Sequence, residues 1–372
     1  MPYPTPFLPT NLPKSMTSMK SMRDSYDILS EFGNLATRAQ VKKGLEFLHS
    51  HRKQSRRVEA FYHSLKRRLD PDKPFYRFKT KNSLVRTILN EYFAYFRAVF
   101  NETLVPEKAE ERLTTTLRAS LGYGERKLNR LRESVAEKEF LGNGREPTSL
   151  DLIELDLADR LRLEGFHFLG GVTLPYRGPY LYERQERVEF QVELPLLEMS
   201  VAVIFMHDFH ALGWLDFATL GLRRTGGWSK TDALYCVNSA WDRESEKFLV
   251  NFLKHEAQHQ YDYSRFPQIA DGRQEILEYR AKLAELVFTS DPRHLERLLA
   301  SADPKSLSPH CRAAFQIQKG FEKSGASRFG DLRGTPKGAL KVKDVNDIAR
   351  ELYAESNQEL LGGNGPEKYD GW

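Results

Sequence analysis

Five consecutive residues near position 257 have the types and the spacing of a metal site: His255, Glu256, Ala257, Gln258 and His259. On a helix, residues four apart lie on one face about one turn from each other, so both imidazoles can reach the same ion. Glu256 can then reach a water molecule that the ion holds. Zinc that acts on water needs three protein ligands and one open position. The segment therefore predicts two of three ligands for a catalytic zinc ion.

The third ligand must come from elsewhere, and Glu278, nineteen residues after His259, is the leading candidate. Apolar periodicity predicts one helix over 243–261 and a second at about 273–288. Glu275 is the rival ligand, because it lies one turn before Glu278 on the second helix. The sequence leaves the choice between these two glutamates open.

These two segments resemble the gluzincin branch of the zincin metallopeptidases, in which the third ligand is the Glu of a Glu-x-x-Ala type motif on a later helix. Glu278-Tyr279-Arg280-Ala281 fits that motif, and its small last residue lets two helices approach closely. The resemblance covers residues 251–286. It implies one zinc ion per chain, with His255, His259 and Glu278 as ligands and Glu256 as the general base.

The resemblance leaves the residues around the ligands to be assigned. The metzincin branch is excluded, because it requires Gly at position 262 and His or Asp at position 265, where this chain has Asp262 and Arg265. Some gluzincins carry an Asp four residues after the ligand Glu to orient a histidine, but that position is Lys282 here. Asp262 and Glu285 are the candidates for that orienting carboxylate. The candidate donors to the reaction's oxyanion are Tyr235, Tyr261, Tyr263, His207, His210 and Arg280.

A site of this kind predicts hydrolysis of peptide bonds in a peptide or protein substrate. Zinc lowers the pKa of a bound water from about 16 to about 7 and polarises the scissile carbonyl. Glu256 accepts the proton of that water and later passes it to the leaving amine.

Length and composition favour a folded protein with room for two domains: the chain has 372 residues, of which 40% are hydrophobic and 12% aromatic. Its two cysteines, Cys236 and Cys311, do not make a disulfide framework, which suits a reducing compartment. No signal-peptide core is present, and no apolar run approaches the ~18 to 20 residues of a membrane span. We therefore expect a cytoplasmic protein that does not enter a membrane.

The charge is unevenly distributed along the chain. Residues 1–150 hold 28 Lys and Arg against 17 Asp and Glu, whereas residues 151–372 hold 28 against 34. Such asymmetry can mark a nucleic-acid surface, but no nucleic-acid-binding module or set of base-stacking aromatics accompanies it. A solvated basic face explains it better. The alternative function is a regulatory or nucleic-acid-binding protein whose zincin-like metal site is structural or inactive.

The pattern of elements predicts an α+β fold in three parts. Residues 1–22, with five prolines, form a flexible arm. Residues 23–145 form a basic helical domain, and the resemblance implies that residues 150–372 form a zincin-like metallopeptidase domain with a small, mostly antiparallel sheet. Strand-like runs lie at 167–174, 180–182, 188–194, 200–207, 214–222 and 232–237, with a turn at 226–228. In zincins an edge strand upstream of the metal-binding helix pairs with extended substrate, and the last of these strands or the one before it has that place.

Overall fold

The computed structural model describes residues 16–73, 78–136, 146–173, 175–270, 272–306, 308–325 and 341–362. The fold is α+β, as the sequence predicted. By its internal contacts the chain divides into two compact units. Unit 1 comprises Met1–Leu181 and His210–Arg224, and unit 2 comprises Tyr182–Phe209 and Thr225–Trp372.

The division between the units differs from the predicted boundary near 146–149. Helix α7 (Ser149–Leu163) follows that boundary, yet it belongs to unit 1 and packs against α5 (Pro106–Leu121). The chain passes into unit 2 only within strand β4 (Tyr180–Glu193) and returns within β5 (Glu198–Leu212). Burial of α7 against earlier helices outweighs the glycine-rich segment that precedes it in the sequence.

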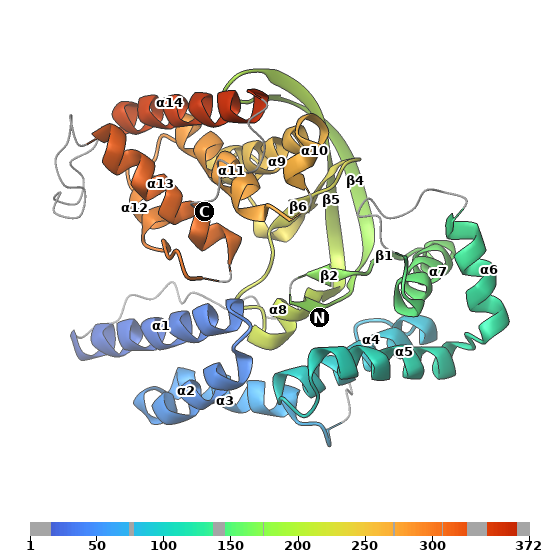
Figure 1. Cartoon of the computed structure of the whole chain (residues 1–372). Helices are drawn as coiled ribbons and strands as arrows, with labels where there is room; N and C mark the ends of the chain where they lie inside the picture. The colour runs from blue at the N-terminus through green and yellow to red at the C-terminus, as the bar shows by residue number, and fades with distance from the viewer. Residues whose placement is uncertain are drawn as a thin grey trace. The chain divides into compact units, whose positions relative to one another are not determined.

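Unit 1 is mainly helical, as predicted for the N-terminal part of the chain (Figure 1). The predicted arm ends earlier than expected, because α1 already begins at Met16, and residues 1–15 lie outside the described residues. The wide apolar stripe of α4 (Ser83–Phe100) is buried, and Phe96 and Phe100 pack there against Phe217 of α8 (Gly213–Thr219). The other helices of unit 1 are α1 (Met16–Thr37), α2 (Val41–His51), η1 (Arg52–Gln54), α3 (Arg56–Leu69) and α6 (Glu125–Ala136).

The strand predicted over 214–222 is wrong, since α8 occupies this part of the chain. Its buried residues Trp214, Phe217 and Ala218 are spaced three and four apart, which suits a helix that packs on one face. Leu220 ends the helix in the left-handed conformation. Unit 1 also contains β1 (His167–Leu169) and an antiparallel hairpin of β2 (Val172–Thr173) and β3 (Tyr176–Arg177).

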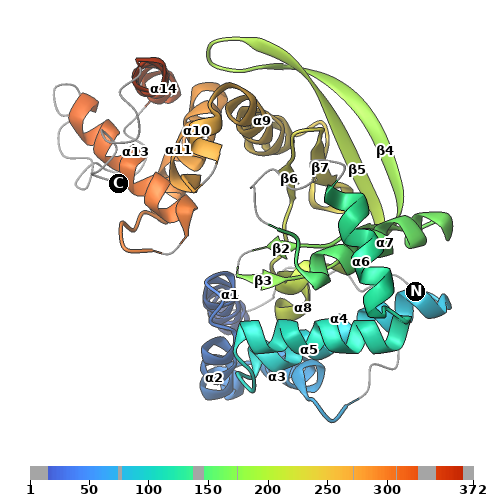
Figure 2. The same ribbon diagram turned by 45° about the vertical axis from the view of Figure 1, so that its right-hand side comes forward.

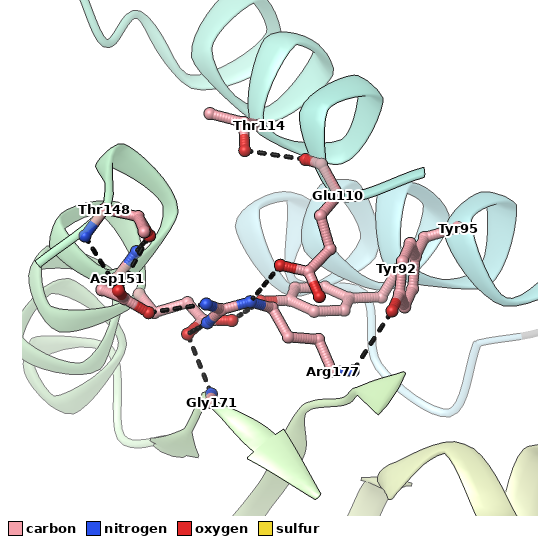
Figure 3. A network of polar contacts seen from close by, with 9 residues as sticks. Tyr92, Tyr95, Glu110, Thr114, Thr148, Asp151, Gly171 and Arg177 are labelled. Atoms are coloured by element: carbon pink, nitrogen blue, oxygen red, sulfur yellow. Dashed lines mark hydrogen bonds and ion pairs between the residues drawn. The ribbon is translucent and has the colours of Figure 1, made fainter. Parts of the chain in front are cut away.

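A buried ionic network holds this hairpin to the helices of unit 1 (Figure 3). The Arg177 guanidinium, 2% exposed, contacts Asp151 at 2.7 Å, Glu154 at 2.6 Å and Glu110 at 3.1 Å. Glu154 also accepts from the Tyr92 hydroxyl and, at 2.8 Å, from the Gly171 N–H. Burial favours the neutral form of Arg177, but the three carboxylates outweigh it and raise the pKa of the guanidinium. Arg177 is therefore the built-in cation of a carboxylate cluster.

The five-stranded sheet has the order β1-β4-β5-β7-β6, with β6 at Gly227–Ser229 and β7 at Leu234–Val237. The sheet is mixed, because β5 and β7 pair in parallel while β6 and β7 pair antiparallel. The segment predicted as a turn at 226–228 instead starts β6. A Cβ added at Gly227 would lie 2.2 Å from the Tyr235 carbonyl oxygen, so only glycine lets β6 lie against β7.

In unit 2 the helices carry the site. A π-helical segment (Lys247–Lys254) continues directly into α9 (His255–Arg265), so the helix begins later and ends later than the predicted 243–261. The second predicted helix is confirmed as α11 (Gln274–Phe288). Both views show α11 between α9 and α13 (Pro309–Gly325) (Figures 1 and 2), and α11 packs against each. The other helices are η2 (Asn238–Ala240), α10 (Pro267–Ala270), α12 (His294–Leu299), α13 (Pro309–Gly325) and α14 (Val342–Leu361).

Candidate metal centre

Helices α9 and α11 bring His255, His259 and Glu278 together. The Nε2 atoms of the two histidines lie 3.1 Å apart, and each lies 3.5 to 3.6 Å from one oxygen of the Glu278 carboxylate. Ligands about 2.0–2.1 Å from a tetrahedral zinc ion are separated by about 3.4 Å, so these separations are close to those of a zinc site. All three residues are buried, and the group could hold a metal ion.

Packing on both sides sets this arrangement. Phe248, Phe252 and Ala257 are buried in a cluster with residues of β5 and β7, which fixes one face of the helix against the sheet. The opposite face then presents its histidines to α11. Ala281 of α11 is fully buried, and its small side chain allows the two helices to pack closely. The π-helical segment lies directly before His255, a feature that often accompanies functional sites.

Two buried atoms of this group, Glu278 Oε2 and His259 Nδ1, form no hydrogen bond of standard geometry with the described part of the chain. Glu278 Oε2 nevertheless lies 2.6 Å from His310 Nδ1, outside the group of three. Burial alone would raise the pKa of Glu278, but His310 and His259 outweigh it and hold this pKa well below its usual range. An ionised, buried carboxylate beside two imidazoles is a donor set that suits zinc.

The Glu285 carboxylate orients the first histidine. Its Oε1 lies 2.6 Å from His255 Nδ1, so Nε2 of the same ring is left to face His259 and Glu278. Burial lowers the pKa of His255, but the hydrogen bond and charge of Glu285 outweigh burial and raise this pKa to about 9. Glu285 Oε2 is held in turn by Asn251, at 2.5 Å, and by His294, at 3.1 Å.

Asp262, the other candidate for an orienting carboxylate, is hydrogen-bonded to residues other than the two histidines. It accepts from Gln258 Nε2 at 2.9 Å and from Arg280 Nε, which lies 3.0 Å from both of its oxygens. Arg280 is fully buried and also donates to the Tyr353 hydroxyl at 3.1 Å. Arg280 was a candidate oxyanion donor, but its guanidinium is enclosed in this ion pair and ties α9 to α11 and α14.

Among the other candidate oxyanion donors, Tyr263 lies at the metal group. Its ring stacks on His259 at 6.3 Å, and its hydroxyl is hydrogen-bonded to Ser229 of β6. Burial raises the pKa of Tyr263, and the charges of Glu256 and Glu278 raise it further.

The remaining candidate donors have other neighbours. Tyr235 donates to Asp232 at 2.9 Å, and Tyr261 packs edge-on against Phe266. His207 lies on β5, where burial and two nearby arginines lower its pKa. His210 belongs to unit 1 and packs against Phe166. The rival ligand Glu275 pairs with Arg312 at 3.1 Å and is not part of the metal group.

Sequence reasoning missed three residues that complete the site: Asn251 and His294 at Glu285, and His310 at Glu278. His310 Nδ1 lies 2.6 Å from Glu278 Oε2. His294 and His310 come from α12 and α13. No residue spacing in the sequence indicates where these two helices pack on α11. Asn251 could have been suspected, because it lies one helical turn before His255.

A pocket of about 370 Å³ opens beside Tyr263, within unit 2. Its lining includes Val201 and Ala202 of β5, Thr231 from the turn between β6 and β7, and Gln260 and Tyr263 of α9. Tyr263, which stacks on His259, links the pocket to the metal group.

The chain matches no protein-family model, and neither a curated protein nor a solved structure resembles it significantly. Within the described ranges, no helix has both the length and the apolarity needed to cross a bilayer.

Proposed function

We propose that this protein is a zinc-dependent, gluzincin-like metallopeptidase. The observation that carries the proposal is the convergence of His255 Nε2, His259 Nε2 and the Glu278 carboxylate at separations of 3.1 to 3.6 Å. Two imidazoles and one carboxylate leave one position of a tetrahedral zinc ion open, which is the arrangement of hydrolytic sites and not of closed structural ones.

Two residues of α9, Glu256 and Tyr263, are then the candidates for the catalytic steps. Bound zinc supplies a water of lowered pKa and polarises the scissile carbonyl. Glu256 follows the first ligand, is only partly buried, and lies close enough to His255 and Tyr263 to affect the pKa of both. It accepts the proton of the attacking water and transfers it to the leaving amine. Tyr263, between Ser229 and the metal group, is the best-placed donor to the oxyanion.

An extended peptide is the substrate that the surroundings favour. β6 ends the sheet on the side of α9, and an edge strand offers backbone N–H and C=O groups to an extended chain. The pocket beside Tyr263 gives room for a substrate side chain, so cleavage would occur at a defined position in the bound peptide.

The first experiment is elemental analysis of protein purified without added metal, for wild type and for Glu278→Ala beside Glu275→Ala. We expect about one zinc per chain in wild type and in Glu275→Ala, and loss of zinc in Glu278→Ala. Glu275 is the matched control because it lies on the same helix and pairs with Arg312. A wild-type protein that takes up no zinc, even after zinc is added, overturns the proposal.

The second experiment measures turnover of an internally quenched peptide library by the zinc-loaded protein. We expect Glu256→Gln to keep its zinc and to lose at least about a hundredfold in rate, because general-base catalysis contributes roughly that much or more. Glu244→Gln, an exposed position upstream on the same segment of chain, should leave the rate unchanged. Normal hydrolysis by Glu256→Gln would rule out the assigned base.

The alternative of a regulatory or nucleic-acid-binding protein makes the opposite prediction. It requires zinc without hydrolysis, together with retention of DNA or RNA that weakens steeply as salt rises.

A further inference from the structure

His310 contacts a candidate ligand from the solvent side. Its imidazole is 59% exposed, whereas the Glu278 carboxylate it touches is 10% exposed. The contact, 2.6 Å between Nδ1 and Oε2, joins α13 to α11, and these helices pack directly on each other. The position of His310 is therefore set by helix packing.

The Glu278 carboxylate faces the two histidines almost symmetrically. Oε1 lies 3.5 Å from His259 Nε2, and Oε2 lies 3.6 Å from His255 Nε2. A carboxylate presented in this way can bind a metal ion through one oxygen or through both. If both oxygens bound zinc, the chain would supply four donor atoms and fill the position that a hydrolytic site keeps open.

Resting on the zinc site proposed above, we propose that His310 is a positioning residue that reserves this open position. His310 Nδ1, 2.6 Å from Glu278 Oε2, competes with the metal for that oxygen, so the carboxylate would bind through Oε1 alone. Hydrogen bonds to an ionised carboxylate are among the stronger ones in proteins, which makes this competition effective. Glu285 performs a comparable orienting task for His255.

The test uses the full-length protein loaded with Co²⁺, whose visible spectrum reports coordination, and azide as a small anion that binds at an open position. We expect wild type to bind azide with a spectral change. His310→Ala should bind azide at least roughly tenfold more weakly, in line with the effect of other residues that orient ligands. His310→Asn should restore azide binding, because its side-chain amide nitrogen can occupy the place of Nδ1.

Arg312→Ala is the matched control, since it removes the ion pair of a neighbouring residue of α13 with Glu275. It should leave both the spectrum and azide binding at the wild-type level. Azide binding by His310→Ala that equals wild type, or an equal loss in Arg312→Ala, overturns the inference. If His310→Ala does not bind cobalt, the test depends on His310→Asn. Azide affinity equal to wild type in His310→Asn supports the inference, and weaker azide binding in this variant overturns it.

Failure of this inference is distinguishable from failure of the proposed function. A wild-type protein that binds neither zinc nor cobalt removes the metal site itself. If wild type binds metal and hydrolyses peptides, but azide binding is unaffected in His310→Ala, only the role proposed for His310 is wrong.

Discussion

Two buried clusters of ionisable side chains, one in each unit, differ in how the charge of their carboxylates is balanced. In unit 1, Arg177 lies among Glu110, Asp151 and Glu154, and the chain itself provides the cation. In unit 2, Glu278 and its two histidines face one another at 3.1 to 3.6 Å, with no cationic lysine or arginine among the three. The first cluster resembles an ion pair in a core, and the second resembles a set of ligands.

Hydrogen bonding separates the two clusters further. Asp151 is held by the Thr148 N–H and hydroxyl as well as by Arg177, and Glu154 is held by Tyr92 and Gly171. In the other cluster, Glu278 Oε2 lacks a hydrogen bond of standard geometry within the described residues, and its near neighbour is His310 Nδ1 at 2.6 Å. Buried polar groups are normally satisfied, so an unsatisfied one requires a reason. In unit 2, a metal ion at Oε1 would complete the contacts of a carboxylate whose Oε2 lies 2.6 Å from His310 Nδ1, and no such ion is needed in unit 1.

The largest expected effect comes from removing the built-in cation of unit 1. Arg177→Met leaves three carboxylates together without their partner, and breaking a buried ion pair on one side costs roughly 3 to 5 kcal/mol. We expect this loss in the free energy of unfolding with urea, and we expect it with or without zinc. Hydrogen–deuterium exchange should locate the loosened backbone in α4, α5 and α7, which carry the network.

Lys108→Met is the control for this variant, because Lys108 forms an exposed pair with Glu111 on the same helix α5. Its stability should equal that of wild type within error, since exposed pairs contribute little. A loss below about 1 kcal/mol for Arg177→Met would mean that the three carboxylates become neutral or hydrated at little cost. The contrast between the two clusters would then be weaker than their geometry indicates.

The next effect is a pH dependence in the metal-free protein. The pKa of His255 is raised from 6.5 to about 9, so protonated His255 stabilises the folded chain fully below pH 6.5. This contribution is lost as pH rises through about 9, and a shift of this size corresponds to roughly 3 kcal/mol. Urea unfolding at pH 6 and at pH 9.5 measures it, and His255→Asn should lack this component of the pH dependence.

Zinc should abolish that dependence between pH 6.5 and 9. A ligand imidazole binds zinc only in its neutral form, so protons compete with the metal and zinc affinity should rise with pH up to about 9. The zinc-loaded protein therefore should not lose stability between pH 6.5 and 9 as the metal-free protein does. Equal pH profiles with and without zinc would contradict His255 as a ligand.

The metal group could be found from the sequence because its geometry is local. Two histidines four apart share a helix face whatever the rest of the fold, and a predicted helix at 273–288 carries Glu278 and Glu285 two turns apart on one face. The choice of Glu278 over Glu275 in the structure depends on the rotation of α11 against α9. Residue spacing alone left that choice open.

The parts that sequence patterns missed depend on packing between distant segments. His310 and His294 reach the site only because α12 and α13 fold back along α11, and nothing near either residue signals that path. The parallel pairing of β5 with β7 likewise depends on the chain between them, where α8 replaced a predicted strand. Apolar residues in short runs fit a helix or a strand equally well, so only their burial decides.

The smallest expected effect tests a third buried cluster, which lies beside the metal group and is satisfied like that of unit 1. The Tyr353 hydroxyl accepts from Arg280 at 3.1 Å and donates to Gln258 Oε1 at 2.9 Å. Tyr353→Phe leaves one acceptor and one donor without that partner, so we expect a loss of about 1 to 3 kcal/mol in urea unfolding. Zinc affinity should not change, because Arg280 still pairs with Asp262 and no ligand contact is removed. A variant of wild-type stability with weakened zinc binding would reverse this assignment, and it would place the Arg280 cluster among the groups that hold the metal.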